Sequence, residues 1–207
     1  MFAAAVALSF AAVLGATIGA GELLELAERP DGSTAFDRSV TSWFVDHRAS
    51  WLTTVARALS TIGSQKVLIP LVAVVAIVLV ARRTLRPAVL LVVIWAGAIE
   101  LYTLAKHVVD RPRPPMHLWL TSAASTAFPS GHAMQSLSTF AALALVAAVV
   151  VSTPRRPALA VAAVIAAGVG CSRVYLGVHW ATDVLAGWLA AACWVALVAG
   201  LAHTRKT

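Results

Sequence analysis

The amino-acid sequence predicts an all-α, polytopic membrane protein whose six transmembrane helices form a bundle. Hydrophobic residues make up 60% of the 207 residues and charged residues only 12%, which is about half the charged share of an ordinary soluble domain. Apolar runs close to the roughly 20 residues that a helix needs to cross a bilayer recur along most of the chain. Residues 1–207 are therefore expected to form a single integral membrane domain without a second, soluble module.

Six apolar runs are the predicted spans, at residues 2–20, 67–81, 87–105, 133–152, 157–172 and 183–202. The second and fifth are short, so their ends are expected to include interfacial residues. The first run occupies the place of a signal peptide, but no Lys or Arg precedes it and no convincing small-residue cleavage site follows it. We therefore interpret it as a membrane span.

A long polar segment separates the first two spans, and its stretch FDRSVTSWFVDHRASWLTTVARALSTIGS covers residues 36–64. Apolar side chains such as Val40, Phe44, Val55 and Leu59 are spaced so that helical faces alternate between apolar and basic. This pattern predicts one or two helices lying in the membrane interface. A helix packed on top of the bundle fits the same spacing equally well.

The short loops predict the orientation, because lysine and arginine near span ends mark the cytoplasmic side. With six spans, three basic clusters fall on one face together with both termini: Arg82, Arg83 and Arg86, then Arg155 and Arg156, then Arg205 and Lys206. The opposite, extracytoplasmic face of the cell membrane receives the polar segment and the loops at 106–131 and 173–182. Those loops also carry basic residues, so we expect some of them to have another task.

The formal net charge of +7 indicates an anionic partner. Interleaved aromatic residues and a continuous basic face, the usual marks of nucleic-acid binding, are missing, so no nucleic-acid partner is expected. Because the basic residues lie in loops beside the membrane, anionic lipid head groups or a phosphate-bearing substrate are the better candidates. The two cysteines, Cys171 and Cys193, lie in apolar helical stretches and are interpreted as packing residues.

The outer loops hold most of the residues that could carry chemistry. The first loop begins with KHVVDRPRP, the stretch FPSGHAMQ leads into the fourth span, and the last loop contains SRVYLGVHWATD. Together they bring three cations, two imidazoles, one carboxylate and a helix amino terminus to one membrane face. The residues concerned are Lys106, Arg113, Ser130, Gly131, His132, Arg173, His179 and Asp183.

The start of the fourth span is a predicted anion site. Ser130 is a good N-cap, and a helix that begins after it points the free backbone N–H groups of Gly131 and His132 outward with the positive end of its dipole. Glycine lets an oxyanion approach the backbone closely. The two arginines can each donate paired hydrogen bonds to phosphoryl oxygens, and the lysine adds a compact point charge.

His179 and Asp183 are four residues apart, which on a helix places them on one face. A carboxylate that bonds one imidazole nitrogen fixes the tautomer and leaves the other nitrogen free as a nucleophile. His132 is suited to a different task, because an imidazole near neutral pH can protonate a leaving alkoxide and then take a proton from water. Each residue taken singly fits an anchor, a cap or a structural pair, but their joint spacing favours a catalytic site.

Three motifs in this order resemble the signature of the type-2 phosphatidic acid phosphatase superfamily, the membrane relatives of the vanadium haloperoxidases. KHVVDRPRP matches K-x6-R-P, PSGH matches in full, and SRVYLGVHWATD matches S-R-x5-H-x3-D, so the core motifs cover residues 106–183. The resemblance implies that His179 attacks phosphorus to form a phosphohistidine, that Asp183 orients it, and that His132 protonates the leaving oxygen and later activates water. It implies that the phosphoryl oxygens are held by Lys106, Arg113, Ser130, Gly131 and Arg173.

The resemblance implies an integral membrane phosphatase that hydrolyses a lipid phosphate or diphosphate, taken from the bilayer, at the outer leaflet. It implies neither a cofactor nor a metal ion, and the sequence has no carboxylate cluster of the kind that binds magnesium. Similar bacterial proteins act on undecaprenyl diphosphate, phosphatidylglycerol phosphate or phosphatidic acid, and the motifs are compatible with each.

Two alternatives stay open at this stage. One is a phosphotransferase that passes the phosphoryl group from the same phosphohistidine to another lipid instead of water. The other is an inactive membrane protein for binding or transport. An ion or proton pathway would place ionisable residues near the middle of the spans, and these spans have none there.

Some polar residues receive no catalytic role. Asp110 and Arg111 are interpreted as a local pair that shapes the loop, with Arg111 also a candidate for attracting phosphate. Glu100, the one acid inside an apolar span, is interpreted as a structural partner in the bundle. Three further histidines match no motif: His47, His117 and His203.

Overall fold

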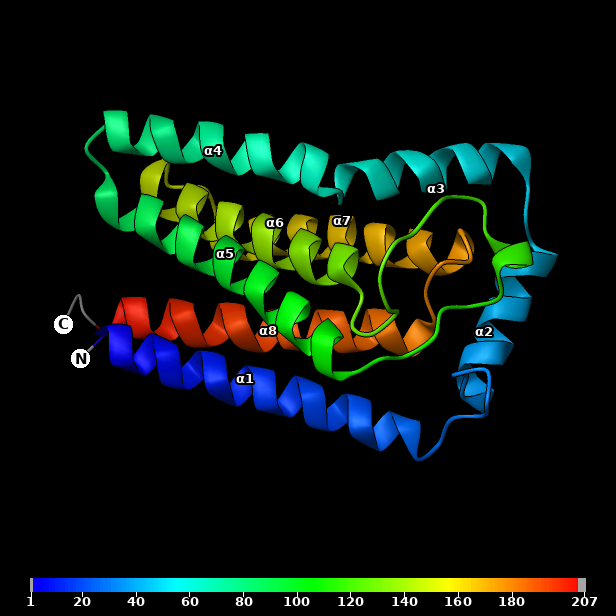
Figure 1. Ribbon diagram of the computed structural model, residues 1–207. Coiled ribbons are helices and arrows are strands. Elements are labelled where there is room, and N and C mark those ends of the chain that lie inside the picture. The colour runs from blue at the N-terminus through cyan, green and yellow to red at the C-terminus, as the bar shows by residue number, and fades with distance from the viewer. Residues whose placement is uncertain (1, 205–207) are drawn as a thin grey trace.

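The computed structural model describes residues 2–204 and contains a bundle of long helices with both chain ends at the same end of the bundle (Figure 1). Five single helices are long and apolar enough to cross a membrane: α1 (Phe2–Glu25), α5 (Leu85–Val108), α6 (Gly131–Val150), α7 (Arg155–Tyr175) and α8 (Ala181–His203). Each coincides with a predicted span apart from a few residues at its ends. The described residues contain no β-strand, so the all-α prediction is confirmed.

Two helices in line, α3 (Ser50–Ile62) and α4 (Gln65–Ala81), make the sixth crossing and meet at a bend of 43°. Figure 1 shows them along one side of the bundle, running back toward the end that carries the termini. Because α1 ends and α5 begins at opposite ends of the bundle, the chain crosses back between them through α3 and α4. The sequence assigned this crossing to residues 67–81 alone.

The reason for this difference is the length of α4. Its 17 residues rise only about 25 Å at 1.5 Å per residue, which is less than the roughly 30 Å of a bilayer core. Helix α3 supplies the remainder and packs along α7. The polar segment was expected to form one or two helices in the membrane interface. It forms two, of which α3 lies along the bundle and α2 lies across its end.

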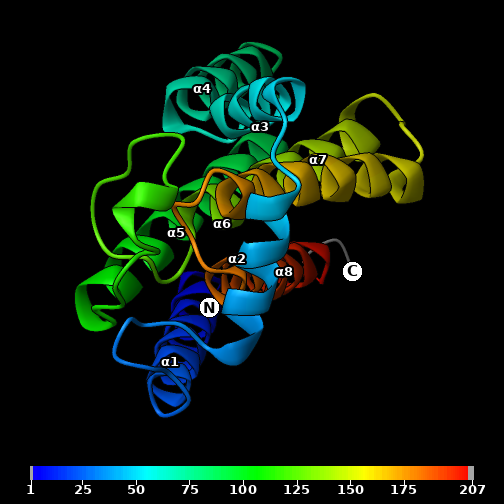
Figure 2. The ribbon, with the colours of Figure 1, turned by 90° about the vertical axis from the view of Figure 1, so that its right-hand side faces the viewer.

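Helix α2 (Ala35–Asp46) crosses the end of the bundle opposite the termini (Figures 1 and 2). It begins with a capping box, in which the Asp37 backbone N–H donates to Thr34 Oγ1 and the Thr34 backbone N–H donates to Asp37 Oδ2, both at 3.1 Å. Asp37 is fully buried. Helix α2 therefore presents a carboxylate to the end of the bundle.

The core is centred on α6, which packs against α5, α7 and α8. Its buried positions include small residues such as Ala133 and Ala142, and small side chains let helix backbones approach closely. Trp194 of α8 packs against Gly97 of α5, where any side chain would collide with the indole, and its Nε1–H donates to the Ile94 carbonyl at 2.9 Å. These contacts fix the relative positions of the helix ends.

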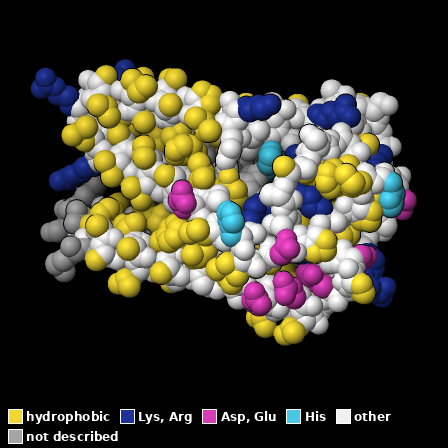
Figure 3. Space-filling model, viewed as in Figure 1, with side chains coloured by type: hydrophobic (Ala, Val, Ile, Leu, Met, Phe, Trp, Pro, Cys, Tyr) yellow, Lys and Arg dark blue, Asp and Glu magenta, His cyan; other side chains and the backbone are white. Residues whose placement is uncertain are grey.

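The surface is divided along the bundle (Figure 3). In this view, apolar side chains gather over the half that carries the termini, and most of the acidic side chains gather at the opposite end. The long loop after α5, with its short 3-10 helix η1 (Met116–Leu118), lies at that opposite end as well (Figure 1). The polar chemistry of the chain is therefore concentrated at one end of the bundle.

Candidate active site

All eight predicted site residues lie at the end of the bundle opposite the termini. The alternating direction of the helices brings there the C-terminal end of α5 with Lys106, the N-terminal end of α6 with Ser130, and the C-terminal end of α7 with Arg173. His179 precedes α8, and Asp183 lies in its first turn. Motifs that are far apart in sequence thus meet because each lies at a helix end on the same side.

His179 and Asp183 form the buried pair that their spacing predicts. His179 Nδ1 lies 3.2 Å from Asp183 Oδ2, and the same oxygen accepts a hydrogen bond from the Trp180 backbone N–H at 2.8 Å. The two side chains are 3% and 0% exposed. A carboxylate beside Nδ1 favours the tautomer with its proton on that nitrogen, so the lone pair of Nε2 is available for chemistry.

Three cations act on the His179 ring. Burial lowers the pKa of His179 well below its usual value, and the positive charges of Arg113, Lys106 and Arg173 lower the pKa further. The imidazole is therefore neutral at physiological pH, which is the form that can attack an electrophile. Arg113 Nη1 lies 3.1 Å from Nε2 of His179. A guanidinium donor therefore lies directly beside the imidazole nitrogen that is not bound to Asp183.

Arg113 is held in place by the surrounding loops. Its Nε donates to the Ser125 carbonyl at 2.8 Å, its Nη2 donates to the Thr126 carbonyl at 3.1 Å, and its Nη1 donates to the Val178 carbonyl. The guanidinium is therefore fixed before any ligand arrives. An anion beside His179 would meet a positive charge that needs no rearrangement.

Two polar atoms of the site are buried without a hydrogen-bond partner among residues 2–204. They are Ser130 Oγ and Arg173 Nε, although Arg173 Nη1 donates to Ser60 Oγ. Ser130 is the N-cap of α6 as predicted, but its hydroxyl makes no capping hydrogen bond. Because buried polar groups nearly always have partners, these two atoms mark positions where a polar ligand fits.

The beginning of α6 is packed tightly against its neighbours. The Ser130 backbone N–H donates to the Asp183 carbonyl at 3.0 Å, and a Cβ at Gly187 would lie 2.8 Å from the Ser130 carbonyl. A Cβ at Gly131 would lie 3.2 Å from the Tyr102 ring. Gly187 therefore lets α8 approach the PSGH segment closely, and Gly131 lets the start of α6 lie against Tyr102 of α5.

The remaining two predicted residues line the same region. Lys106 Nζ donates to the Thr126 carbonyl at 2.5 Å and to the Ala127 carbonyl at 3.3 Å, so it holds the loop that leads into α6. His132 lies in the first turn of α6, and its ring forms no hydrogen bond with any residue in the described part of the chain. Its ring nitrogens are therefore available to a ligand.

Arg111 is a buried residue whose importance the sequence analysis underestimated. Its side chain is 1% exposed, and its guanidinium binds three carboxylates, with Nη1 on Asp183 Oδ1, Nη2 at 2.9 Å from Asp37 Oδ2, and Nε at 2.6 Å from Glu28 Oε1. The Nε–H itself donates to the Gly32 carbonyl at 3.0 Å, so the contact with Glu28 is an ion pair without hydrogen-bond geometry.

The expected local pair between Arg111 and Asp110 is not formed, because Asp110 is exposed and Arg111 points into the site. Local spacing could not reveal the true partners, since Asp37 lies 74 residues before Arg111 in the chain. The only available signal was the arginine-rich run RPR itself, whose two cations turn out to have different partners.

The charged contacts of Arg111 extend to His179 through Asp183. Burial opposes the charge of Arg111, but the carboxylates of Asp183, Asp37 and Glu28 outweigh it and raise the pKa of Arg111. Burial also raises the pKa of Glu28. Asp183 binds Arg111 through Oδ1 and His179 through Oδ2. A continuous chain of charged contacts therefore leads from Glu28, in the loop after α1, and Asp37 of α2 to the imidazole.

The arrangement combines an oriented neutral imidazole, a second imidazole and three cations in one cluster. This combination suits nucleophilic attack on a centre that carries negative oxygens, such as a phosphoryl group. Within residues 2–204, no three His, Cys, Asp or Glu side chains are grouped so as to hold a metal ion.

The chain is similar to known membrane proteins. The family model described as PAP2 superfamily matches residues 87–206. Phosphatidylglycerophosphatase B of Bacillus subtilis (strain 168) is 30% identical over 168 residues, which are 80% of this chain and 82% of that protein. An undecaprenyl-diphosphatase of Sulfolobus acidocaldarius is 35% identical over 136 residues, 63% of this chain and 61% of that protein.

A solved structure matches the whole bundle. The crystal structure of a transmembrane PAP2 type phosphatidylglycerolphosphate phosphatase from Bacillus subtilis aligns with a TM-score of 0.77 and 26% sequence identity, and the alignment covers 96% of this chain and 94% of that chain.

Proposed function

Because this chain belongs to the PAP2 superfamily, we propose that its His179–Asp183 pair hydrolyses the phosphate monoester or diphosphate of a membrane lipid. The chain is a multi-pass membrane phosphatase, and its relatives include a phosphatidylglycerophosphatase and an undecaprenyl-diphosphatase. The proposed substrates are accordingly undecaprenyl diphosphate, phosphatidylglycerol phosphate or phosphatidic acid.

The observation that carries this proposal is the environment of His179 Nε2. The imidazole is buried and bound to a carboxylate through Nδ1, and three cations act on it. Ser130 Oγ and Arg173 Nε are buried beside it without partners in the described chain. A phosphoryl group fits these atoms, because its phosphorus is an electrophile for Nε2 of His179 and its oxygens accept hydrogen bonds from Ser130 Oγ and Arg173 Nε.

The proposed reaction has two steps. In the first, Nε2 of His179 attacks phosphorus, the bond from phosphorus to the leaving oxygen breaks, and His132 gives that oxygen a proton. Asp183 stabilises the positive charge that the ring gains, because its Oδ2 accepts from Nδ1. In the second step His132 takes a proton from water, the water oxygen attacks phosphorus, and inorganic phosphate leaves with His179 restored.

Five groups would bind the phosphoryl oxygens in both steps: Lys106, Arg113, Arg173, the Ser130 hydroxyl and the Gly131 backbone N–H. Arg113 already points a donor at Nε2, and a phosphoryl oxygen would accept that hydrogen bond when Nε2 bonds to phosphorus. Donors that are fixed in advance stabilise the charge that develops in the transition state.

The site is proposed to face the extracytoplasmic side of the cell membrane, with both termini cytoplasmic. The support is the charge of the loops, because the end of the bundle that carries the termini also carries Arg82, Arg83, Arg86, Arg155 and Arg156, and basic residues near span ends mark the cytoplasmic face. The acyl or prenyl tail of the substrate would remain among the apolar helices while its head group enters the cluster.

Phosphate release from a panel of lipid phosphates tests the catalytic proposal. His179→Ala should lower kcat by roughly 10⁴-fold or more, and His132→Ala should lower it by about 10²- to 10⁴-fold, the usual contribution of a general acid and base. His117→Ala is the matched control, because His117 is an exposed histidine of the same end of the bundle and should keep the normal rate. A normal rate in His179→Ala would contradict the proposal.

The covalent intermediate has its own test. Rapid quenching of the wild-type protein during turnover should leave a phosphoryl group on the peptide that carries His179, measured by mass spectrometry at alkaline pH. Free phosphate should appear without an added lipid acceptor, since water is the proposed acceptor. Turnover that never labels His179, or that requires an added lipid acceptor, argues against this mechanism.

A further inference from the structure

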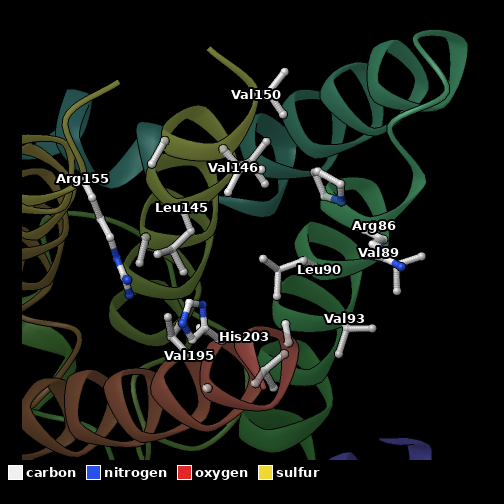
Figure 4. Close-up of a pocket in the computed structure, with 18 of the residues that line it drawn as sticks. Arg86, Val89, Leu90, Val93, Leu145, Val146, Val150, Arg155, Val195 and His203 are labelled. Atoms are coloured by element: carbon white, nitrogen blue, oxygen red, sulfur yellow. The ribbon is translucent and has the colours of Figure 1, made fainter. Parts of the chain in front are cut away.

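A large cavity opens at the end of the bundle that carries the termini, opposite the His179 cluster. Its volume is about 1490 Å³, and it lies between α5, α6 and α8 (Figure 4). Apolar side chains from these three helices form its walls, among them Leu90, Val93, Leu145, Val146 and Val195. The cavity is therefore suited to hydrocarbon.

Four basic side chains also line this cavity: Arg83, Arg86, Arg155 and His203. In Figure 4 the side chains of Arg155 and His203 extend toward the cavity from two different helices. None of the four side chains has a hydrogen bond or ion pair with another residue in the range 2–204. Their donors are therefore free for a ligand.

The described residues at this end of the bundle supply no carboxylate side chain to balance these groups. Residues 79–92, 146–160 and 196–204, which form this end of α4, α5, α6, α7 and α8, contain no Asp or Glu. A cluster of positive charges without carboxylates favours an anionic partner, and basic pockets between transmembrane helices are suited to anionic lipid head groups.

The apolar walls and the basic side chains of the cavity together indicate which kind of ligand it binds. A water-soluble anion would use the arginines but not the valine- and leucine-lined walls, and a neutral lipid would use the walls but not the arginines. We propose that this cavity binds one anionic phospholipid, with its acyl chains between α5, α6 and α8 and its phosphodiester at Arg86, Arg155 and His203.

The proposed head-group site is separate from the His179 cluster. Helix α6 begins at that cluster, and its 20 residues make it about 30 Å long, whereas Arg86, Arg155 and His203 lie near its other end. The apolar wall of the cavity extends along α6 as far as Leu137. A phosphodiester at the basic end therefore lies far from His179, and its binding does not depend on the proposed reaction. Its role is to fill the space between three helices and to neutralise their basic ends.

Lipid binding to the purified protein tests this proposal, with His179→Ala as the background so that no turnover takes place. Phosphatidylglycerol should be retained in native mass spectrometry and should raise the apparent Tm, and phosphatidylcholine with the same acyl chains should do neither. Phosphatidylglycerol is chosen because it is a phosphodiester and lacks the terminal phosphate of the proposed substrates.

Paired charge variants locate the head group. The double variant Arg86→Gln/Arg155→Gln removes two lining cations and should weaken phosphatidylglycerol binding by about 25-fold, at roughly a factor of five for each basic contact. The matched control Arg82→Gln/Arg156→Gln removes two neighbouring cations that do not line the cavity and should leave the affinity unchanged. Equal weakening in both pairs would show a diffuse charge effect and overturn the assignment.

A second pair of variants locates the acyl chains. Val149 lines the cavity and is 55% exposed, whereas Val161 of α7 does not line it and is 60% exposed. Val149→Trp should displace the lipid, and Val161→Trp should retain it. The proposal fails if both tryptophan variants bind alike, if phosphatidylcholine binds as well as phosphatidylglycerol, or if soluble glycerol phosphate stabilises the protein as much as the intact lipid.

Discussion

At the scale of single residues, Asp183 binds two different partners, one through each oxygen of its carboxylate. One oxygen lies beside Nδ1 of His179, the proposed nucleophile, and the other binds Arg111, which is itself bound to Asp37 and Glu28. An uncompensated buried carboxylate is costly, so Asp183 depends on this guanidinium for its charge. Arg111 acts on the reaction through Asp183 and is therefore expected to be a positioning residue.

Replacement of Arg111 tests this role. Arg111→Lys keeps the charge but cannot reach the three carboxylates at once. It should lower kcat by about 10²-fold through misplacement of Asp183 and leave KM nearly unchanged, since Arg111 does not contact substrate in the proposed reaction. Arg57→Lys, at an arginine that donates to the Leu120 carbonyl from the exterior, is the control. A change confined to KM would instead place Arg111 among the phosphate-binding groups.

The depressed pKa of His179 predicts a dependence of stability on pH. Burial and the neighbouring cations keep the folded-state pKa well below the unfolded value near 6.5, so the unfolded chain takes up a proton first as the pH falls. Stability should therefore decrease below about pH 6.5. Between about pH 7.5 and about pH 5, the apparent Tm should fall further for the wild type than for His179→Gln, which does not titrate in this range. Parallel curves would contradict the depressed pKa.

At the scale of elements, the junction between α2 and α3 holds the loops above the site. Arg48 Nη2 donates to the Leu118 carbonyl at 2.7 Å and to the Tyr175 carbonyl at 3.0 Å. The Tyr175 hydroxyl donates to the Ala49 carbonyl at 3.1 Å. The chain then turns at Gly177, whose φ of +74° is a left-handed conformation, and reaches His179 two residues later. The position of His179 thus depends on this turn.

Gly177→Ala should therefore disturb the site. A side chain at φ +74° is strained, and its Cβ would collide with the Leu118 carbonyl, so the variant should lose about 1 to 3 kcal/mol of stability together with most of the phosphatase activity. Gly19→Ala is the matched control, because nothing lies within 4 Å of a Cβ there. Thermal unfolding and phosphate release measure both variants. Equal behaviour of the two would show that the turn has no special requirement.

At the scale of the whole molecule, six crossings place both termini at one end of the bundle and the catalytic cluster at the other (Figure 1). Acidic residues are absent from the end that carries the termini and its loops. We expect the resulting charge asymmetry to orient the chain in the membrane, and the same basic residues border the cavity between α5, α6 and α8.

Labelling of intact cells tests this topology. Cys171 and Cys193 are exposed, contrary to the buried packing role that the sequence suggested, so both are first replaced by alanine. In this background, Ser122→Cys introduces an exposed thiol in the loop after η1, which should react with a membrane-impermeant maleimide from outside. Arg156→Cys, exposed at the opposite end of the bundle, should react only after lysis. The reverse pattern would place the catalytic cluster in the cytoplasm.

The long spans and the grouping of the candidate site residues could be predicted from the sequence. Span length depends on runs of apolar residues, and the spacing of His179 and Asp183 predicted their contact. The contact forms although His179 precedes α8 and only Asp183 lies in its first turn. The order of the three motifs along alternating spans was sufficient to predict that they meet on one face.

Contacts between distant parts of the chain complete these elements. Helix α3 joins α4 because α4 is too short to cross alone. Arg111 finds its partners in the loop after α1, on α2 and on α8, and Ser130 Oγ has no hydrogen-bond partner among residues 2–204. The cavity between α5, α6 and α8 likewise forms where helices from different parts of the sequence meet. Each of these features is a contact between residues distant in the chain, and such contacts follow from packing and have no local signature in the sequence.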